Sequence, residues 1–394
     1  MKRKRLWLIA GLVAASAVAF FTLAPGIAEN SMNKVVGDPS AVSQRAAALH
    51  EKLFIADLHS DALMWKRGLL TQSSRGHVDL PRLVQGGVGL QVFSSVSKTP
   101  RGINYDHNSG DSDSITLLSI GQLQPPRTWF SLFERSLYHA QKLEAAAKAS
   151  GGALRLIRTK ADLANLMTAR AGPGLSKLYG KPVGALFSVE GLHDLEGKEA
   201  NLGRLYDAGL RMAGLTHFFD NELGSSMHGI KQAGLTPFGR QIVRDMEARG
   251  IIVDIAHLSH KGVAEVLAMA TKPVISSHGG VQATCKVNRN LTDEEVKGIA
   301  KTGGVVGIGY WDGAVCSLKP ADIAKAILHV RDIAGIDHVA LGSDFDGAVT
   351  TGFDTSGVAH VTQALIDAGL SDADIAKVMG GNVARVLMQT LPEG

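Results

Sequence analysis

Residues 251–280 read IIVDIAHLSHKGVAEVLAMATKPVISSHGG, and this stretch decides the fold of the chain. It begins as an apolar strand, continues through a polar turn and a helix, and ends as a second apolar strand. A histidine follows each strand, His257 after the first and His278 after the second. Side chains two residues apart on a strand point the same way. We therefore expect His257 to project to the side of the apolar row before it, and His278 to the side of Val274.

These two histidines are expected to meet. Two parallel strands joined by a short crossover helix lie side by side, so His257 and His278 reach the same carboxyl edge of the sheet. Barrels and open sheets of parallel strands hold their chemistry at that edge. Either histidine alone is more often a capping or packing residue, but two imidazoles at adjacent strand ends favour half of a metal site.

Apolar stretches that read as strands occur eight times along the chain, with helical stretches between them. They are the stretch leading to His59, residues 88–96, 183–190 and 210–216, the two strands of 251–280, and residues 304–310 and 338–343. Six of the eight end in a residue that can bind a metal or move a proton. This pattern predicts an α/β fold, a (β/α)8 barrel of the TIM type. A doubly wound sheet is the alternative, but it requires a glycine-rich phosphate loop where the chain has HSDAL.

A long insertion, residues 97–181, separates the second and third strands of the predicted barrel. It contains one helix predicted over 128–150 and another that begins with the capping pair Thr159 and Asp162. Such an insertion above a barrel either shapes the substrate mouth or is a packing excursion, and both interpretations stay open.

The barrel domain is expected to span residues 39–394. It would begin with a helix over 39–53 and end with a helix over 372–388, which Gly380-Gly381-Asn382 interrupts. A further capping pair, Thr292 and Glu295, predicts a helix after the second histidine.

Residues 1–28 have the features of an export signal. Basic residues at 2–5 precede an apolar run from Leu6 to Leu23, and small residues follow at Gly26 and Ala28. The run is 18 residues long and reaches the length that spans a bilayer, so the segment is either cleaved after Ala28 or retained as an anchor. No cysteine lies in this segment, which excludes a lipoprotein anchor. We expect an exported protein, periplasmic or extracellular, with attachment to the inner membrane as the alternative.

The net charge of the chain bears on its binding partners, and its cysteine content bears on the redox state of its cellular compartment. The four basic residues at 2–5 account for the whole net charge of +4, so nothing indicates a nucleic-acid binder. The only cysteines are Cys285 and Cys316. In an exported protein an even number of cysteines favours a disulfide bond, and we predict that these two pair. Two unlinked buried thiols are the alternative.

Residue types that bind metals collect at the predicted strand ends. His59 and Asp61 lie two apart on an extended segment and can chelate one ion. Glu190 ends the buried third strand, where a carboxylate must form a salt bridge or bind metal. Together with His257 and His278 they offer three nitrogens and two carboxylates, enough for two divalent ions that share Glu190. The set contains no thiolate, which suits zinc in a hydrolytic site with open positions.

Three other positions carry groups that could act on a substrate. His217 follows the fourth strand, and Arg289 lies between two asparagines as the natural anchor for an anion. Asp344 follows the eighth strand, with Asp346 two residues later.

Several motifs at these positions resemble the membrane (renal) dipeptidase family of zinc metallopeptidases. They are DLHSD at 57–61, SVEG at 188–191, GLTH at 214–217, DIAHLS at 254–259, SHG at 277–279, RN at 289–290, GSDFDG at 342–347 and GGNVARV at 380–386. The resemblance covers about residues 54–387, and the order and spacing of the motifs make it specific. Members of this family are relatives of the amidohydrolases and have a distorted barrel.

The resemblance implies a role for each candidate residue. His59 and Asp61 would hold one zinc, His257 and His278 the other, and Glu190 would bridge the two ions, which would activate a hydroxide between them. His217 would contact the scissile carbonyl oxygen, and Arg289 would bind the free carboxylate of the dipeptide. Asp344, rather than Asp346, would accept the proton of the attacking hydroxide and return it to the leaving amine. A bridge between the two cysteines is also common in this family.

The function implied is that of an exported zinc-dependent dipeptidase, whose substrates would include dipeptides with a D-residue on the carboxyl side. The resemblance leaves a homodimer open. One alternative is another binuclear amidohydrolase, but those relatives usually begin with H-x-H and bridge their metals with a modified lysine, where this chain has H-x-D and a glutamate. A second alternative is an inactive barrel that binds metal, against which Asp344 and Arg289 argue.

Overall fold

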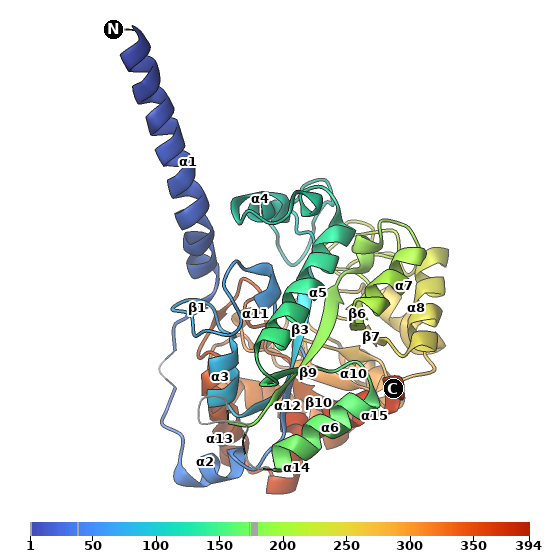
Figure 1. The fold of residues 1–394 in the computed structure, drawn as a ribbon. Coiled ribbons are helices and arrows are strands. Elements are labelled where there is room, and N and C mark those ends of the chain that lie inside the picture. The colour runs from blue at the N-terminus through green and yellow to red at the C-terminus, as the bar shows by residue number, and fades with distance from the viewer. Residues whose placement is uncertain (1, 38, 173, 175–179) are drawn as a thin grey trace.

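A closed barrel of eight parallel strands forms the centre of the computed structural model, which describes residues 2–37, 39–172, 174 and 180–394 (Figure 1). Its strands are β2 (Ile55–Asp57), β3 (Val88–Val96), β5 (Val183–Glu190), β6 (Leu210–Gly214), β7 (Ile252–Asp254), β8 (Ile275–Ser276), β9 (Val305–Ile308) and β10 (Val339–Leu341). Each strand pairs with the next, and β10 pairs with β2 to close the ring. The predicted barrel is therefore confirmed, and each of the eight predicted strands contributes to it.

Three short strands of the described chain lie outside the ring and were not predicted: Lys34–Val35 (β1), which pairs with Thr350–Thr351 (β11), and a strand within the insertion. β4 (Leu154–Leu156), within the insertion, pairs in parallel with Val183–Ala185 at the start of β5. Three residues are too few to show a two-residue period, so the sequence carried no usable signal for this strand.

Helices connect the barrel strands, and α1 precedes them at the N-terminus. They are α1 (Lys2–Met32), α2 (Gln44–His50), α3 (Leu80–Gln85), α4 (Ser114–Gly121), α5 (Leu132–Ala149), α6 (Lys160–Ala171), α7 (Ala200–Asp207), α8 (Pro237–Arg249), α9 (His260–Met269), α10 (Asp293–Lys301), α11 (Asp312–Val315), α12 (Pro320–Ala334), α13 (Ala359–Asp367), α14 (Asp372–Ala376) and α15 (Asn382–Thr390). Capping decides several of their ends: Thr159 with Asp162 and Thr292 with Glu295 form the predicted capping boxes. The helix predicted over 39–53 is shorter, because the Ser43 side chain caps its first turn and the helix ends at His50.

The last predicted helix is interrupted as expected. α14 and α15 are separated by a π-helical segment, Lys377–Gly381. A β-carbon on Gly380 would lie 2.1 Å from the carbonyl oxygen of Phe54, so only glycine lets this segment approach the first barrel strand so closely.

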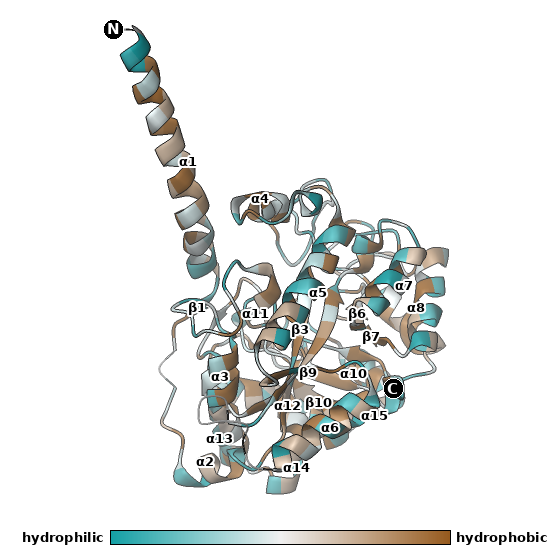
Figure 2. Cartoon of the chain, in the orientation of Figure 1, coloured by the Kyte–Doolittle hydropathy of each residue, from teal (hydrophilic) through white to brown (hydrophobic). Residues whose placement is uncertain are grey.

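Two apolar layers stabilise the barrel. The inner cluster contains a residue from every barrel strand, and only the barrel interior can bring all eight together: Ala56, Leu90, Val92, Leu186, Met212, Ile252, Ile275, Val305 and Ala340. α6 and α15 lie together at the lower end of the barrel and close it with apolar residues (Figure 1). The larger cluster fills the space between the strands and the outer helices. Figure 2 shows the strands predominantly brown, the apolar end of the scale.

The expected direction of the side chains in 251–280 was wrong. Ile252 and Ile275 point into the barrel, whereas Ile251, Val253 and Val274 pack in the outer cluster with α8 and α9. Both phases of a fully buried strand are apolar, so the period alone cannot tell the inner face from the outer one.

α1 projects away from the barrel, and Figure 2 shows it brown over most of its length (Figures 1 and 2). It is long and apolar enough to cross a membrane, a property that signal sequences and anchors share. Its last turns contact a loop beside the barrel, where the Glu29 carboxylate lies 2.6 Å from Arg67 Nε. After the helix, Lys34–Val35 (β1) pairs with Thr350–Thr351 (β11) in a separate two-stranded sheet. Residues before 39 thus contact the folded chain, and a barrel domain over residues 39–394 stays a prediction.

The predicted disulfide is present between Cys285 and Cys316, with their α-carbons 5.4 Å apart. It links the loop after β8, which carries Arg289, to the end of α11 after β9. A structural disulfide is consistent with export.

We expect replacement of both cysteines by serine to lower the free energy of unfolding by about 3–4 kcal/mol, because the bridge closes a loop of 31 residues and restricts the unfolded chain. Urea denaturation of the double variant and of the oxidised parent measures this difference. Adding reductant should destabilise the parent and leave the double variant unchanged. Equal stability of the two proteins under oxidising conditions would contradict the prediction.

Candidate functional site

The carboxylate of Glu190 lies at the centre of a buried group of histidines at the carboxyl ends of the barrel strands. Its Oε1 atom is 2.8 Å from His257 Nε2, 3.1 Å from His278 Nε2 and 3.5 Å from His217 Nε2. Its Oε2 atom is 3.5 Å from His59 Nε2. Gly191 follows at φ +90°, a conformation that glycine adopts most readily, so the chain turns away directly after Glu190.

The predicted ligands all lie in this group, and three overlapping sets have ligand atoms within 4.8 Å of one another. The sets are His59, Glu190 and His278; Glu190, His217 and His257; and His59, Asp61 and Asp344. His59 and Asp61 are as close as their spacing suggested, with 3.3 Å between His59 Nε2 and Asp61 Oδ1. The clusters that share Glu190 therefore resemble a metal site.

His257 reaches this group through a local break in the strand. The strand phase would direct its side chain toward the outer helices, but His257 has φ +65°, in the left-handed region. Non-glycine residues rarely adopt this conformation, and it occurs preferentially at functional sites. The result is a separation of 3.0 Å between the Nε2 atoms of His257 and His278. The two histidines meet as predicted, but for a different geometric reason.

Two buried aspartates that were not predicted as site residues form hydrogen bonds next to the histidines of the cluster. Asp57 accepts hydrogen bonds from the backbone N–H of His59 at 3.1 Å and from that of Ser343. Asp254 accepts a hydrogen bond from the Ser277 hydroxyl, whose oxygen lies 2.8 Å from His278 Nδ1. The contact of Asp254 with the His278 ring through Ser277 is of the kind that orients histidines in metal sites, whereas Asp57 fixes the backbone at His59. Each aspartate opens one of the motifs quoted above, and this position is the signal that could have identified them.

Burial controls the charge of the site. It lowers the pKa of His257 and of His278 well below the usual range, so both rings are neutral, the form that binds metal. Burial alone would raise the pKa of Glu190, but the surrounding histidines, His217 and His59 foremost, hold it well below its ordinary value. Burial alone would lower the pKa of His59, but Glu190 and Asp61 raise it well above its ordinary value. The neutral rings of His257 and His278 beside the ionised Glu190 are donors that suit a divalent cation.

The side chains of the cluster fit a divalent metal ion. Among the residues that the structure describes, the buried His59 Nε2 and Asp61 Oδ1 atoms form no hydrogen bond, although they lie 3.3 Å apart. Leaving buried polar atoms unsatisfied is costly, and a cation between them would satisfy both. The donors are imidazole nitrogens and carboxylate oxygens without thiolate, as in hydrolytic zinc sites.

His217 and Arg289 approach the cluster from the side of His257. The ring of His217 packs edge-on against that of His257, with 4.8 Å between centroids. Arg289 is buried, and its Nη2 atom donates to the carbonyl oxygen of His278 at 2.9 Å and lies 3.5 Å from His257 Nε2. Its guanidinium also lies 5.8 Å from the ring centre of Trp311. A positive group is thus held next to the metal-site-like cluster.

The structure distinguishes Asp344 from Asp346. Asp344 Oδ1 is 3.9 Å from His59 Nε2, and its side chain lines the cavity above the cluster. Asp346 is fully buried elsewhere and accepts hydrogen bonds from the backbone N–H groups of His77 and Val78 and from Arg67. Both aspartates have positive φ, 59° and 66°, so the loop directs alternate side chains to different surroundings. Only Asp344 joins the candidate site.

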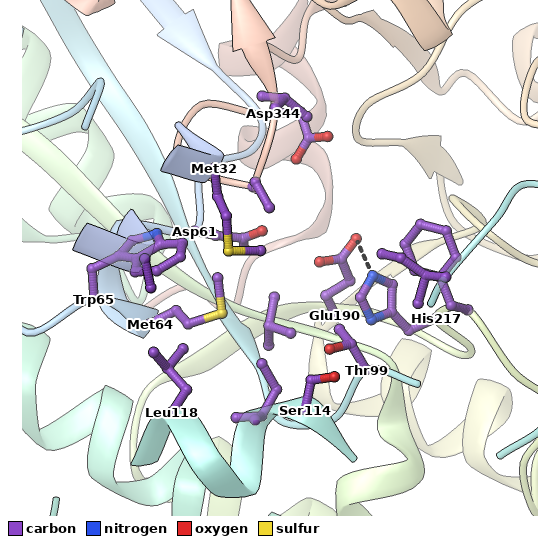
Figure 3. Close-up of a pocket in the computed structure, with 18 of the residues that line it drawn as sticks. Met32, Asp61, Met64, Trp65, Thr99, Ser114, Leu118, Glu190, His217 and Asp344 are labelled. Carbon is purple, nitrogen blue, oxygen red and sulfur yellow. Dashed lines mark ion pairs between the residues drawn. The ribbon is translucent and has the colours of Figure 1, made fainter. Parts of the chain in front are cut away.

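A cavity of about 520 Å³ opens over the cluster. Figure 3 shows Glu190 and His217 on one side of it and Met64, Trp65 and Leu118 on the other. Tyr105, Phe218 and Trp311 line it as well. None of these apolar and aromatic residues was identified from the sequence, because Tyr105 and Leu118 lie in the insertion and the others lie in loops or turns after barrel strands, where no periodic pattern shows which side chains face the cavity.

Known proteins resemble this chain over most of its length. The profile of the membrane dipeptidase family, peptidase family M19, matches residues 43–392. The dipeptidase tcpJ of Claviceps purpurea is 30% identical over 332 residues, which are 81% of this chain and 70% of that protein. The dipeptidase aclJ of Aspergillus oryzae is 29% identical over 358 residues, which are 84% of this chain and 77% of that protein.

Solved structures share the fold. The dipeptidase AC, a family M19 metallopeptidase, superposes with a TM-score of 0.70 at 20% identity and covers 86% of this chain and 99% of its own. A metallopeptidase from Rhodobacter sphaeroides, liganded with a phosphinate mimic of L-Ala-D-Ala, has a TM-score of 0.68 at 21% identity. The match covers 86% of this chain and 99% of the Rhodobacter chain.

Proposed function

The chain belongs to the membrane dipeptidase family and is a metallodipeptidase, and on that premise we propose that it is an exported, two-zinc enzyme whose substrates include L,D-dipeptides. The observation that carries the proposal is the Glu190 carboxylate, which faces imidazoles from three other strand ends. His59 and Asp61 would hold one zinc, His257 and His278 the second, and Glu190 would bridge the pair. When bound, two such ions supply an activated water and polarise a carbonyl oxygen.

Arg289 would place the substrate. Its buried guanidinium binds the free carboxylate of a dipeptide, because a planar cation matches a carboxylate in both charge and shape. A longer peptide would bring a neutral amide to the same place and leave the charge of Arg289 unpaired. Selectivity for two-residue substrates follows from the short distance between Arg289 and His257.

His217 and Asp344 would act on the peptide bond. His217 stabilises the negative charge that develops on the carbonyl oxygen as water adds to the carbon. Asp344 takes a proton from the attacking water and delivers it to the leaving nitrogen as the C–N bond breaks. Burial raises the pKa of the Asp344 carboxyl well above its usual value, which helps it to hold that proton during the transfer.

Dipeptides with a D-residue on the carboxyl side are included in the proposal. A structural relative is liganded with a phosphinate mimic of L-Ala-D-Ala, and it shares the barrel that carries this site. We further propose that residues 1–28 direct export, as a cleaved signal or a retained anchor, and that the catalytic unit is one barrel domain. The apolar α1 and the disulfide support this location.

Removing the metal should abolish hydrolysis. We expect the purified protein to cleave a panel of L,L- and L,D-dipeptides, to lose this activity after chelation, and to regain it with added zinc, because activation of water depends on the ions. Zinc content per chain is measured beside the rate of amine release. Activity that chelation leaves unchanged would contradict the proposed function.

Replacing Arg289 should affect only substrates with a free carboxylate. We expect Arg289→Met to lower kcat/KM for dipeptides by about 100-fold or more, since a buried, charge-assisted contact is lost. Dipeptide amides, which lack the carboxylate charge, should be poor substrates for the parent and change much less. A uniform decrease for acids and amides would argue against an anchoring role for this residue.

A further inference from the structure

One side of the cavity is an apolar wall made of Met64, Trp65, Val96, Ile115 and Leu118, which pack together as one cluster. The first two residues belong to the turn that follows Asp61, Val96 ends β3, and the last two lie on α4 of the insertion. Figure 3 shows Met64, Trp65 and Leu118 gathered beside Asp61. The insertion between the second and third barrel strands therefore contributes directly to the cavity.

The polar atoms of the wall are already satisfied within the protein. The indole N–H of Trp65 donates to the backbone carbonyl of Asp346 at 2.7 Å. The carbonyl of Met64 accepts from Gln122, and that of Trp65 accepts from Lys142. The wall consequently offers carbon surface to a ligand, and a charged group placed against it would lose its water without gaining a partner.

The wall and Arg289 lie on different sides of Glu190. Val96 is the strand partner of Glu190, and Met64 and Trp65 follow Asp61, so the wall adjoins the side of the site formed by His59 and Asp61. Arg289 contacts His257 and His278 instead. A dipeptide with its carboxylate on Arg289 and its peptide bond over Glu190 extends its amino-side residue toward the wall.

We propose that the apolar wall is the subsite for the side chain of the amino-side residue, and that it selects large apolar side chains such as leucine, methionine and phenylalanine. This inference rests on the proposed dipeptidase function. Selection follows because such a side chain buries its surface against the wall, whereas glutamate or lysine would bury a charge there. The cavity has the size of a small-molecule site, for which about 300–1,000 Å³ is typical.

The test compares four dipeptides, Leu-Ala, Gly-Ala, Glu-Ala and Lys-Ala, with the zinc-loaded full chain. We expect kcat/KM for Leu-Ala to exceed that for Glu-Ala and Lys-Ala by about 10- to 100-fold, the range that an apolar pocket provides. Leu118, half-buried on the helix surface, is changed to lysine or glutamate. Leu118→Lys should raise the kcat/KM of Glu-Ala relative to that of Leu-Ala by about tenfold or more. Leu118→Glu should raise the kcat/KM of Lys-Ala relative to that of Leu-Ala by a similar factor.

Leu123 provides the matched control, since it is 58% exposed just after α4 and does not line the cavity. Leu123→Lys and Leu123→Glu should keep the ratios of the parent. Peptides with the order reversed, such as Ala-Leu and Ala-Glu, should respond little to the Leu118 changes. A response confined to the carboxyl-side residue would overturn the assignment of the subsite.

The two proposals fail in different ways. If the zinc-loaded parent cleaves no dipeptide, the proposed function is wrong. If it cleaves all four dipeptides with equal kcat/KM, the function stands and the apolar subsite is refuted. If neither Leu118 variant folds, the kcat/KM of the parent for Leu-Ala relative to Glu-Ala and Lys-Ala still tests the subsite. The uncharged variant Leu118→Gln should then reduce this preference for Leu-Ala.

Discussion

Glu190→Gln is expected to lower dipeptide hydrolysis by more than about 1,000-fold, the effect of losing several kcal/mol of metal-derived stabilisation. The carboxylate faces four imidazoles, three through Oε1 and one through Oε2. A glutamine side chain of the same size offers one acceptor oxygen and a neutral NH2 group, which cannot bridge two cations. The variant should therefore lose zinc as well as activity.

Metal content and folding separate the possible outcomes. Zinc per chain is measured after dialysis, and circular dichroism reports on the fold. Glu199→Gln is the matched control, because Glu199 is exposed and lies nine residues away along the chain. It should retain the zinc and the activity of the parent. If Glu190→Gln kept two zinc ions and full turnover, the metal centre would have to lie elsewhere.

The second large effect is expected at Asp344 and should distinguish it from Asp346, two positions later. Asp344→Asn is expected to lower kcat by about 100- to 10,000-fold, the usual contribution of a proton-transfer group. Zinc content and the free energy of unfolding should be nearly unchanged, because Asp344 lines a cavity rather than filling a packed position. KM should change far less than kcat, since substrate anchoring belongs to Arg289.

Asp346→Asn should behave in the opposite way. Its carboxylate is buried against Arg67 and the N–H groups of His77 and Val78, and breaking such a pair costs about 3–5 kcal/mol of stability. Urea denaturation measures this loss, while kcat per folded molecule should stay within about tenfold of the parent. Loss of kcat in Asp346→Asn with full activity in Asp344→Asn would reverse the assignment.

Local patterns in the sequence were enough for the fold. Buried parallel strands are short apolar runs, and their number, with helices between them, specified a closed barrel. Capping at Thr159 and Thr292 could also be predicted, because a capping box depends on residues three positions apart. β4 and the true length of α2 were missed, since a three-residue strand and an early helix end leave little pattern.

The candidate site was predictable in its members but not in its geometry. Each ligand candidate ends or follows a strand, and parallel strands bring their carboxyl ends to one rim, so the sequence placed His59, Glu190 and His278 at the same edge of the barrel. The direction of the His257 side chain was not predictable, because His257 itself has a left-handed backbone conformation and does not continue the two-residue period of the strand. Asp57 and Asp254 were not predicted, because their contribution is to hydrogen-bond neighbouring groups, and those partners are known only from the folded structure.

The sequence by itself determined that eight strands form a barrel and which side chains meet at its rim. Only the tertiary structure decided that Asp344 faces the cavity while Asp346 pairs with Arg67, and that an apolar wall stands beside Asp61. The physical reason is the range of the interactions. Strand periodicity and capping depend on neighbours along the chain, whereas the surroundings of a loop residue depend on segments far away, such as the 97–181 insertion.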